Sequence, residues 1–118
     1  MSETVRGRLW SSSRAPDVGE NSQVLAKLGQ VVIEQILSGP LPAPVDYDQS
    51  HDEWVLVLEG AAVLEVAGER FGLDQGDWML LPANVPHRLV ECRPGTSWLA
   101  VHRFQVPVDA LPDQRECR

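Results

Sequence analysis

The feature that most constrains the fold is the frequent interruption of the chain by turn-forming residues from Val31 onward. Short runs rich in apolar and β-branched residues alternate with clusters of Gly, Pro, Asn and Asp. Short strands with turn signals every ~8–12 residues are typical of β-sandwiches and β-barrels. The predicted strands cover residues 31–37, 53–58, 61–66, 69–73, 78–81, 87–91 and 97–106. No helix separates them, so a βαβ arrangement is excluded and the predicted fold class is all-β.

The chain is long enough for one domain, since it has 118 residues. We expect an N-terminal arm over residues 1–30, a strand-rich domain over 31–106 and a C-terminal tail over 107–118. Within the arm, the apolar pair Leu9-Trp10 is expected to dock onto the domain. Glu20 to Leu28 is predicted as a short helix, because Val24, Leu25 and Leu28 form an apolar stripe and Gly29 would end it.

The net charge and the N-terminal sequence indicate which partners and which location to expect. The net charge of -7 argues against nucleic acids and anionic membranes, which both require a basic surface. The polar N-terminus has no apolar core of a signal peptide, and no apolar run approaches the ~20 residues of a membrane span. A cytoplasmic protein in which Cys92 and Cys117 are reduced is therefore expected, although a disulfide stays open.

The stretch from Asp46 to Gly60 begins polar and ends as an apolar strand. If the polar half is also extended, alternate side chains share a face. The four polar residues on the face that Val55 and Val57 continue are Tyr47, Gln49, His51 and Glu53. Polar groups above a hydrophobic interior indicate the mouth of a pocket.

The opposite face of this strand is also apolar, because it carries Trp54, Leu56 and Leu58. A strand that is apolar on both faces is covered on both. Either the N-terminal arm or a second copy of the chain would cover the outer face. We expect a homodimer, with cover by the arm alone as the alternative.

These motifs resemble those of the cupin family, whose members are small jelly-roll (double-stranded β-helix) barrels. Glu53 and Gly60 have the spacing of the end of the first cupin motif, and Gly76, Pro82 and His87 have that of the second. Two positions of the second motif differ, since Asn84 replaces a glycine and Glu91 replaces an asparagine. The usual histidine pair of the first motif is absent. The resemblance covers roughly Val31 to Phe104.

The resemblance implies a divalent metal ion inside the barrel. Glu53 and His87 stand at ligand positions of the family, and His51 is the candidate to replace a missing histidine. Two imidazoles and one carboxylate suit Fe, Mn, Ni or Zn, and the ligand types do not choose among them. The alternatives are a hydrogen-bonded barrel histidine for His87, an exposed rim residue for His51, and a salt bridge from Glu53 to Arg88 or Arg103.

Further pocket candidates are Tyr47, Gln49 and His102. Three functions are compatible with this set. The first is a metal-dependent oxygenase, isomerase or lyase that acts on a small polar molecule. The second is a non-catalytic binder of a small ligand, and the third is a structural barrel with a vestigial metal site. Whether the protein is an enzyme stays open, because a fold does not determine a function.

Overall fold

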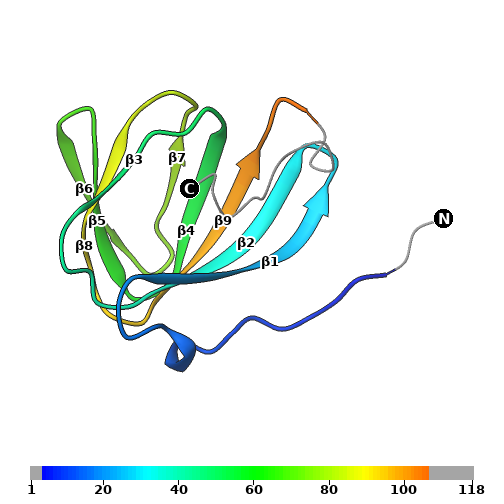
Figure 1. The fold of residues 1–118 in the computed structure, drawn as a ribbon, viewed down its shortest axis with the longest axis horizontal. Coiled ribbons are helices and arrows are strands. Elements are labelled where there is room, and N and C mark those ends of the chain that lie inside the picture. Colours follow the sequence, from blue (N-terminus) through cyan, green and yellow to red (C-terminus); the bar gives the residue numbers. More distant parts are fainter. Residues whose placement is uncertain (1–3, 107–118) are drawn as a thin grey trace.

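The computed structural model describes residues 4–106, which form nine strands in two antiparallel sheets (Figure 1). One sheet has the order β1-β2-β9-β4-β7, from Glu20–Leu28, Val31–Ser38, Thr96–Arg103, Asp52–Glu59 and Trp78–Leu81. The other has the order β3-β8-β5-β6, from Val45–Tyr47, His87–Cys92, Ala61–Val66 and Glu69–Asp74. The all-β prediction is therefore confirmed. The predicted tail 107–118, with Cys117, lies outside the described residues.

Local sequence signals explain several of these elements. The β5–β6 hairpin turns at Ala67 and Gly68, whose φ angles are 52° and 81°, as the right-handed twist of a tight hairpin favours. Asn84, which replaces the motif glycine, has a φ of 63° in the turn before β8. Asn tolerates this left-handed conformation better than most residues do, so the substitution preserves the turn.

The predicted helix over Glu20–Leu28 is wrong, because this segment is strand β1 and pairs with β2 along its length. The register of the pair shifts between Val24 and Ala26. A bulge of this kind interrupts the alternation of side chains. The interrupted alternation places apolar residues at spacings that imitate a helix. The only helical element among the described residues is a 3-10 turn at Ser12–Arg14.

The stretch from Asp46 to Gly60 is divided between the two sheets. Tyr47 ends β3, which pairs with β8, whereas Glu53 lies in β4, which pairs with β7 and β9. The chain crosses from one sheet to the other over residues 48–51. The predicted single strand is thus interrupted, yet Gln49, His51 and Glu53 are all buried.

Gly60 closes β4 at a place that no other residue fits well. Its φ is 100°, and a Cβ atom there would lie 2.8 Å from Cα of Thr96 and closer still to its Oγ1. Thr96 Oγ1 accepts a hydrogen bond from the backbone N–H of Ala61 at 3.2 Å. The glycine therefore allows β9 to pack against the start of β5.

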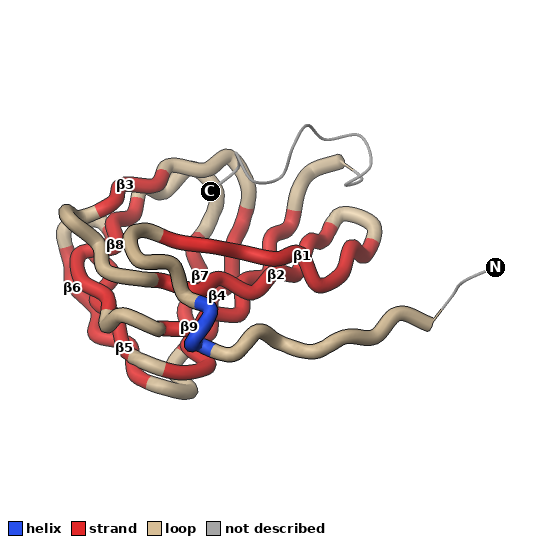
Figure 2. The backbone as a smooth tube through the Cα atoms, turned by 60° about the horizontal axis from the view of Figure 1, so that its bottom comes forward, coloured by secondary structure: helices blue, strands red, loops and turns tan. Residues whose placement is uncertain are grey.

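The hydrophobic core fills the space between the sheets. Its buried members come from most strands and include Ile36, Val55, Val57, Leu64, Leu81, Leu89 and Trp98. Figure 2 shows the N-terminal segment running along the outside of the sheets. The backbone N–H and C=O of Trp10 both bond the side-chain amide of Gln35, at 2.7 and 3.0 Å. The predicted docking of Leu9-Trp10 therefore holds for Trp10, whereas Leu9 is 45% exposed.

The outer face of the five-stranded sheet is only partly covered in the described structure. Trp78 is 62 % exposed and Leu80 is 57 % exposed. Trp54, on the neighbouring strand β4, packs beside Trp78 with ring centroids 6.0 Å apart. Within residues 4–106, no helix is long and apolar enough to cross a membrane.

Candidate functional site

A small cavity between the sheets brings three ionisable residues together, and we call it the interior cavity. Glu20, Glu53 and His87 line it, and its volume is ≈ 40 Å³. The rest of its lining is apolar and consists of Ile36, Val55, Leu64, Leu81, Leu89 and Trp98. Burying an ionisable group in apolar surroundings is costly unless it is bonded or paired. Ionisable groups at such a place mark a candidate functional site.

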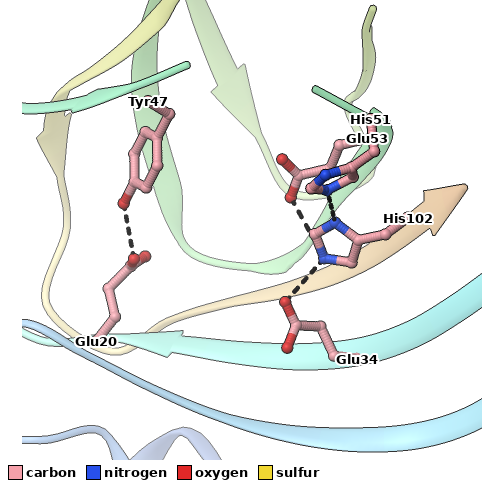
Figure 3. Close-up of polar contacts among 6 residues, drawn as sticks. All are labelled: Glu20, Glu34, Tyr47, His51, Glu53 and His102. Carbon is pink, nitrogen blue, oxygen red and sulfur yellow. Dashed lines mark hydrogen bonds and ion pairs between the residues drawn. The ribbon is translucent and has the colours of Figure 1, made fainter. Parts of the chain in front are cut away.

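Glu20 reaches the cavity from β1 and accepts two hydrogen bonds there. Tyr47 donates its phenol O–H to one carboxylate oxygen at 2.9 Å, and Ser38 donates its hydroxyl to the other at 2.9 Å (Figure 3). Ser38 in turn accepts the indole N–H of Trp98 at 3.1 Å. The Tyr47 ring stacks on the ring of His87, with centroids 5.1 Å apart and an interplanar angle of 17°. Glu20 thereby orients the tyrosine that covers His87.

On the other side of Figure 3, two histidines and a glutamate form a chain of hydrogen bonds. His51 Nε2 lies 2.9 Å from His102 Nδ1, and His102 Nε2 lies 2.8 Å from Oε1 of Glu34. All three side chains are buried. Oε2 of Glu53 lies 3.8 Å from the same His102 Nε2. We call His51, His102 and Glu34 the relay, and Glu53 connects it to the interior cavity.

The chemistry of the partners fixes the direction of these bonds. A carboxylate only accepts, so His102 donates Nε2–H to Glu34. When His102 is neutral, its Nδ1 accepts the Nε2–H of His51. With His102 neutral, the hydrogen bonds therefore run from His51 through His102 to Glu34.

His51 itself resists protonation. Burial and the neighbouring His102 lower its pKa from 6.5 to about 4, although Asp52 and Glu34 oppose the shift. The ring also packs on Phe104, with centroids 4.3 Å apart. His51 is thus neutral at pH 7 and anchors the relay.

His87 is held differently. Burial lowers the pKa of His87, while the backbone at Val85 and the charge of Asp48 raise it. The side chain is 8 % exposed, and its Nδ1 is buried without a hydrogen-bond partner. A buried polar atom without a partner is rare in native proteins and often marks a ligand site.

His87 also lines a second, larger opening, which we call the rim pocket. This pocket has a volume of ≈ 510 Å³ and lies where β3 and β5 end and β8 begins. Its lining residues are Asp46, Tyr47, Asp48, Glu65, Ala67, Gly68, Val85, Pro86, His87 and Arg88. His87 is the residue that lines both the rim pocket and the interior cavity.

Metal binding by His51, Glu53 and His87 stays a prediction. Among the described residues, no group of three or more His, Cys, Asp or Glu side chains is placed to hold a metal ion. Glu53 and His87 line the same cavity, but His51 bonds His102 through Nε2. Two of the three predicted ligands therefore lie in one cavity, and the third is bonded to His102.

The structure places the other candidates in distinct roles. Tyr47 covers His87, and His102 is the centre of the relay. Gln49 is buried, and its backbone C=O accepts the N–H of Asn84 at 2.7 Å. The two arginines considered as salt-bridge partners of Glu53 have other acidic partners. Arg88 pairs with Asp46 and Arg103 pairs with Asp52, each at 2.7 Å.

Sequence reasoning missed Glu20 and Glu34. The signal for Glu34 was available, because it interrupts the apolar run from Val31 to Leu37. It shares the inward face of β2 with Val32 and Ile36, and a charged residue there needs a buried partner. Glu20 could not be recognised in this way, since its segment was predicted as a helix.

Comparison with known proteins identifies the family. The family model for the cupin domain matches residues 32–102. A solved structure from Ralstonia eutropha JMP134, named a putative mannose-6-phosphate isomerase, is 33% identical to this chain. The match covers 83% of this chain and 99% of the Ralstonia chain, with a TM-score of 0.68. A cupin superfamily protein from Desulfitobacterium hafniense DCB-2 is 21% identical over 80% of this chain and 87% of its own, with a TM-score of 0.65. KdgF from a Halomonas species is 19% identical, and the match covers 74% of this chain and 82% of KdgF, with a TM-score of 0.67. The search of curated proteins found no match. The chain belongs to the cupin family.

Proposed function

We propose that this cupin binds a small polar molecule through the rim pocket and exchanges a proton with the group that reaches the interior cavity. The observation that supports this most is the meeting of Glu20, Glu53 and His87 in a cavity whose other walls are apolar. Catalytic acids and bases are found in such surroundings, where burial and neighbouring charges adjust their pKa values.

The two cavities differ in size, and each suits a different part of a ligand. A space of ≈ 40 Å³ accommodates a water molecule or one functional group, whereas ≈ 510 Å³ is within the usual range for a bound small molecule. The body of the ligand occupies the rim pocket, and one end passes His87 to reach Glu53. His87, kept neutral by burial, forms a hydrogen bond with the ligand.

Glu53 carries the proton transfer in this proposal. Its carboxylate takes a proton from the ligand and returns it at another atom or to water. His102 is a positioning residue, because it lies behind Glu53 and bonds Glu34. A proton-transfer reaction of this type is an isomerisation, in which a proton is returned at another atom of the ligand, or an elimination. In an elimination the C–H electron pair forms a double bond, and the leaving group departs with the electron pair of its own bond and takes up the proton. The name of the Ralstonia protein suggests an isomerisation for that protein.

Deuterium uptake tests the proposal without knowledge of the product. The protein, in D₂O, is incubated with a pool of small polar metabolites, and mass spectrometry follows the gain of deuterium at carbon. We expect at least one member to gain deuterium with the wild type and not with Glu53→Gln. Glu91→Gln on β8 is the matched control, because Glu91 is exposed and lines neither the rim pocket nor the interior cavity. Equal uptake with Glu53→Gln would exclude Glu53 as the acid–base group.

The metal-dependent enzyme predicted from the sequence is a second candidate. It is favoured by the unpartnered Nδ1 of His87 and by the presence of Glu53 in the same cavity. We would measure Fe, Mn, Ni and Zn in protein from supplemented medium, for wild type and His87→Ala. About one metal ion per chain in the wild type and none in the variant would establish this candidate. Metal-free wild type after reconstitution would reject it.

We also propose that two copies associate through the outer face of the five-stranded sheet. Trp78 and Leu80 are exposed large apolar side chains next to Trp54, and such patches are typical of protein interfaces. Light scattering of the wild type should give twice the monomer mass of 13.1 kDa, and Leu80→Lys should give the monomer mass. A monomeric wild type at ~100 μM, well above the Kd of a stable dimer, would reject the dimer.

The remaining sequence predictions keep their original basis. We propose a cytoplasmic location, supported by the free thiol of Cys92. The net charge of -7 continues to argue against nucleic acids and anionic membranes as partners.

A further inference from the structure

The rim pocket has a distinct charge. Three carboxylates line it, from Asp46, Asp48 and Glu65, together with one cation, Arg88. The interior cavity beyond His87 adds the carboxylates of Glu20 and Glu53. A ligand that enters by this route therefore meets mainly negative charge.

The one cation of this lining is already engaged. Arg88 donates Nε–H to Oδ1 of Asp46 at 2.7 Å. Asp46 thus balances the charge of Arg88, and an anionic ligand would share the guanidinium with Asp46 while it remained close to Asp48. Glu65 is partly compensated from outside the lining, since Arg70 lies 3.3 Å away. Among the described residues, Asp48 forms no ion pair, so its charge is fully available to a ligand.

A second observation indicates that this acidic pocket receives a ligand. His87 lines the pocket, is 8 % exposed and has an Nδ1 atom without a hydrogen-bond partner. Asp48 lines the same pocket. A carboxylate and a buried imidazole nitrogen without a partner therefore lie in the lining of one pocket. Because a carboxylate only accepts hydrogen bonds, Asp48 suits a ligand group with donors, such as an ammonium or a hydroxyl.

We infer that the ligand of the rim pocket is an uncharged polyol or an amine, and not a phosphorylated or carboxylated molecule. This inference rests on the proposed function, because it concerns the same pocket. An amine places its positive charge near Asp48, while a polyol places a hydroxyl there. A phosphate group would experience repulsion from Asp48 and Glu65, while the charge of the one cation in the lining, Arg88, is already balanced by Asp46.

Two sets of probes matched in size test the charge of the ligand. One set is D-mannosamine, D-mannose and D-mannose 6-phosphate, and the other is ethanolamine, ethylene glycol and glycolate. Binding is measured by NMR from the ring nitrogens of His87 and the amides of Asp48, Ala67 and Gly68. We expect the cationic or neutral member of at least one set to shift these signals, with the anion binding weakest. Stronger binding of the anion would overturn the inference and leave the proposed pocket intact.

Asp48→Asn isolates the charge. We expect this substitution to weaken the binding of the cationic probe about fivefold, which is the effect of one unit charge ~4 Å away in water. The binding of the neutral probe should change little. Glu91→Gln is the control, because it changes the net charge equally from a site four residues along β8 from His87. An equal effect of both variants would overturn the inference, since only the overall charge would then matter. Failure of all six probes to shift His87 would count against a ligand pocket here and hence against the proposed function.

Discussion

Acid should destabilise this protein through one imidazole, that of His51. The ring is 5 % exposed and is bonded to His102, and its pKa falls from 6.5 to about 4. In the unfolded chain the same imidazole binds a proton near pH 6.5. Between pH 6.5 and 4 the unfolded state therefore binds more protons than the folded state. The contribution of His51 to the free energy of unfolding is fully present above pH 6.5 and is lost as the pH falls toward 4.

The size of the effect follows from the two pKa values. Because each pKa unit corresponds to about 1.4 kcal/mol, a fall from 6.5 to about 4 contributes about 3 kcal/mol. This is a large fraction of the ~5–15 kcal/mol by which a domain is normally stable. The slope within the window should approach about 1.4 kcal/mol per pH unit for this residue alone.

The assay is urea unfolding of EDTA-treated protein at intervals from pH 7.5 to 4, for wild type and His51→Gln. Other groups also titrate here, including His87, whose pKa burial lowers. The difference between the two proteins isolates His51. We expect the wild type to lose about 3 kcal/mol more than the variant over this range. Parallel curves, or an NMR titration of His51 with its midpoint above pH 6, would refute the assignment of His51 as a buried neutral base.

Two further substitutions test how the chain positions the site. Gly60→Ala should cost about 2–4 kcal/mol in urea unfolding, because its φ is 100° and the new Cβ would overlap Thr96 Oγ1. Gly72→Ala is the control, since no heavy atom of a more distant residue lies within 4 Å of the position that its Cβ would occupy, and it should change stability by less than about 1 kcal/mol. Gln35→Leu should cost about 1–3 kcal/mol, because it leaves the backbone N–H and C=O of Trp10 unpaired, and the Trp10 amide should exchange faster with solvent. Unchanged exchange at Trp10 would show that Gln35 does not hold this segment.

The sequence predicted the local elements well, because short-range signals determine them. The hairpin from Ala61 to Asp74 follows from its turn residues, and strand β7 matches its apolar run. The positions of Glu53, Gly60 and His87 follow from motif spacing. These features depend on residues close together in the chain, where turn chemistry and alternation apply directly.

The contacts that define the site were less predictable, because they join distant strands. The bond between His102 and Glu34 spans 68 residues, and the bond between Tyr47 and Glu20 spans 27. Only the sheet order places β2 beside β9 and so brings Glu34 to His102. The bulge in β1 concealed the strand that carries Glu20. Strand alternation with Glu53 suggested His51 as a substitute metal ligand, but the position of His102 gives that ring another partner.

The central claim is that a buried chain of hydrogen bonds lies behind Glu53 and joins His51, His102 and Glu34. The most direct test is the ¹⁵N NMR spectrum of the histidine rings at pH 7, including scalar coupling across hydrogen bonds. We predict a coupling between Nε2 of His51 and Nδ1 of His102, whose atoms lie 2.9 Å apart, and a protonated Nε2 on His102. Glu34→Gln should change the His102 signals, while Glu91→Gln should leave them unchanged. Absence of the coupling, together with an unprotonated Nε2 on His102, would contradict the account.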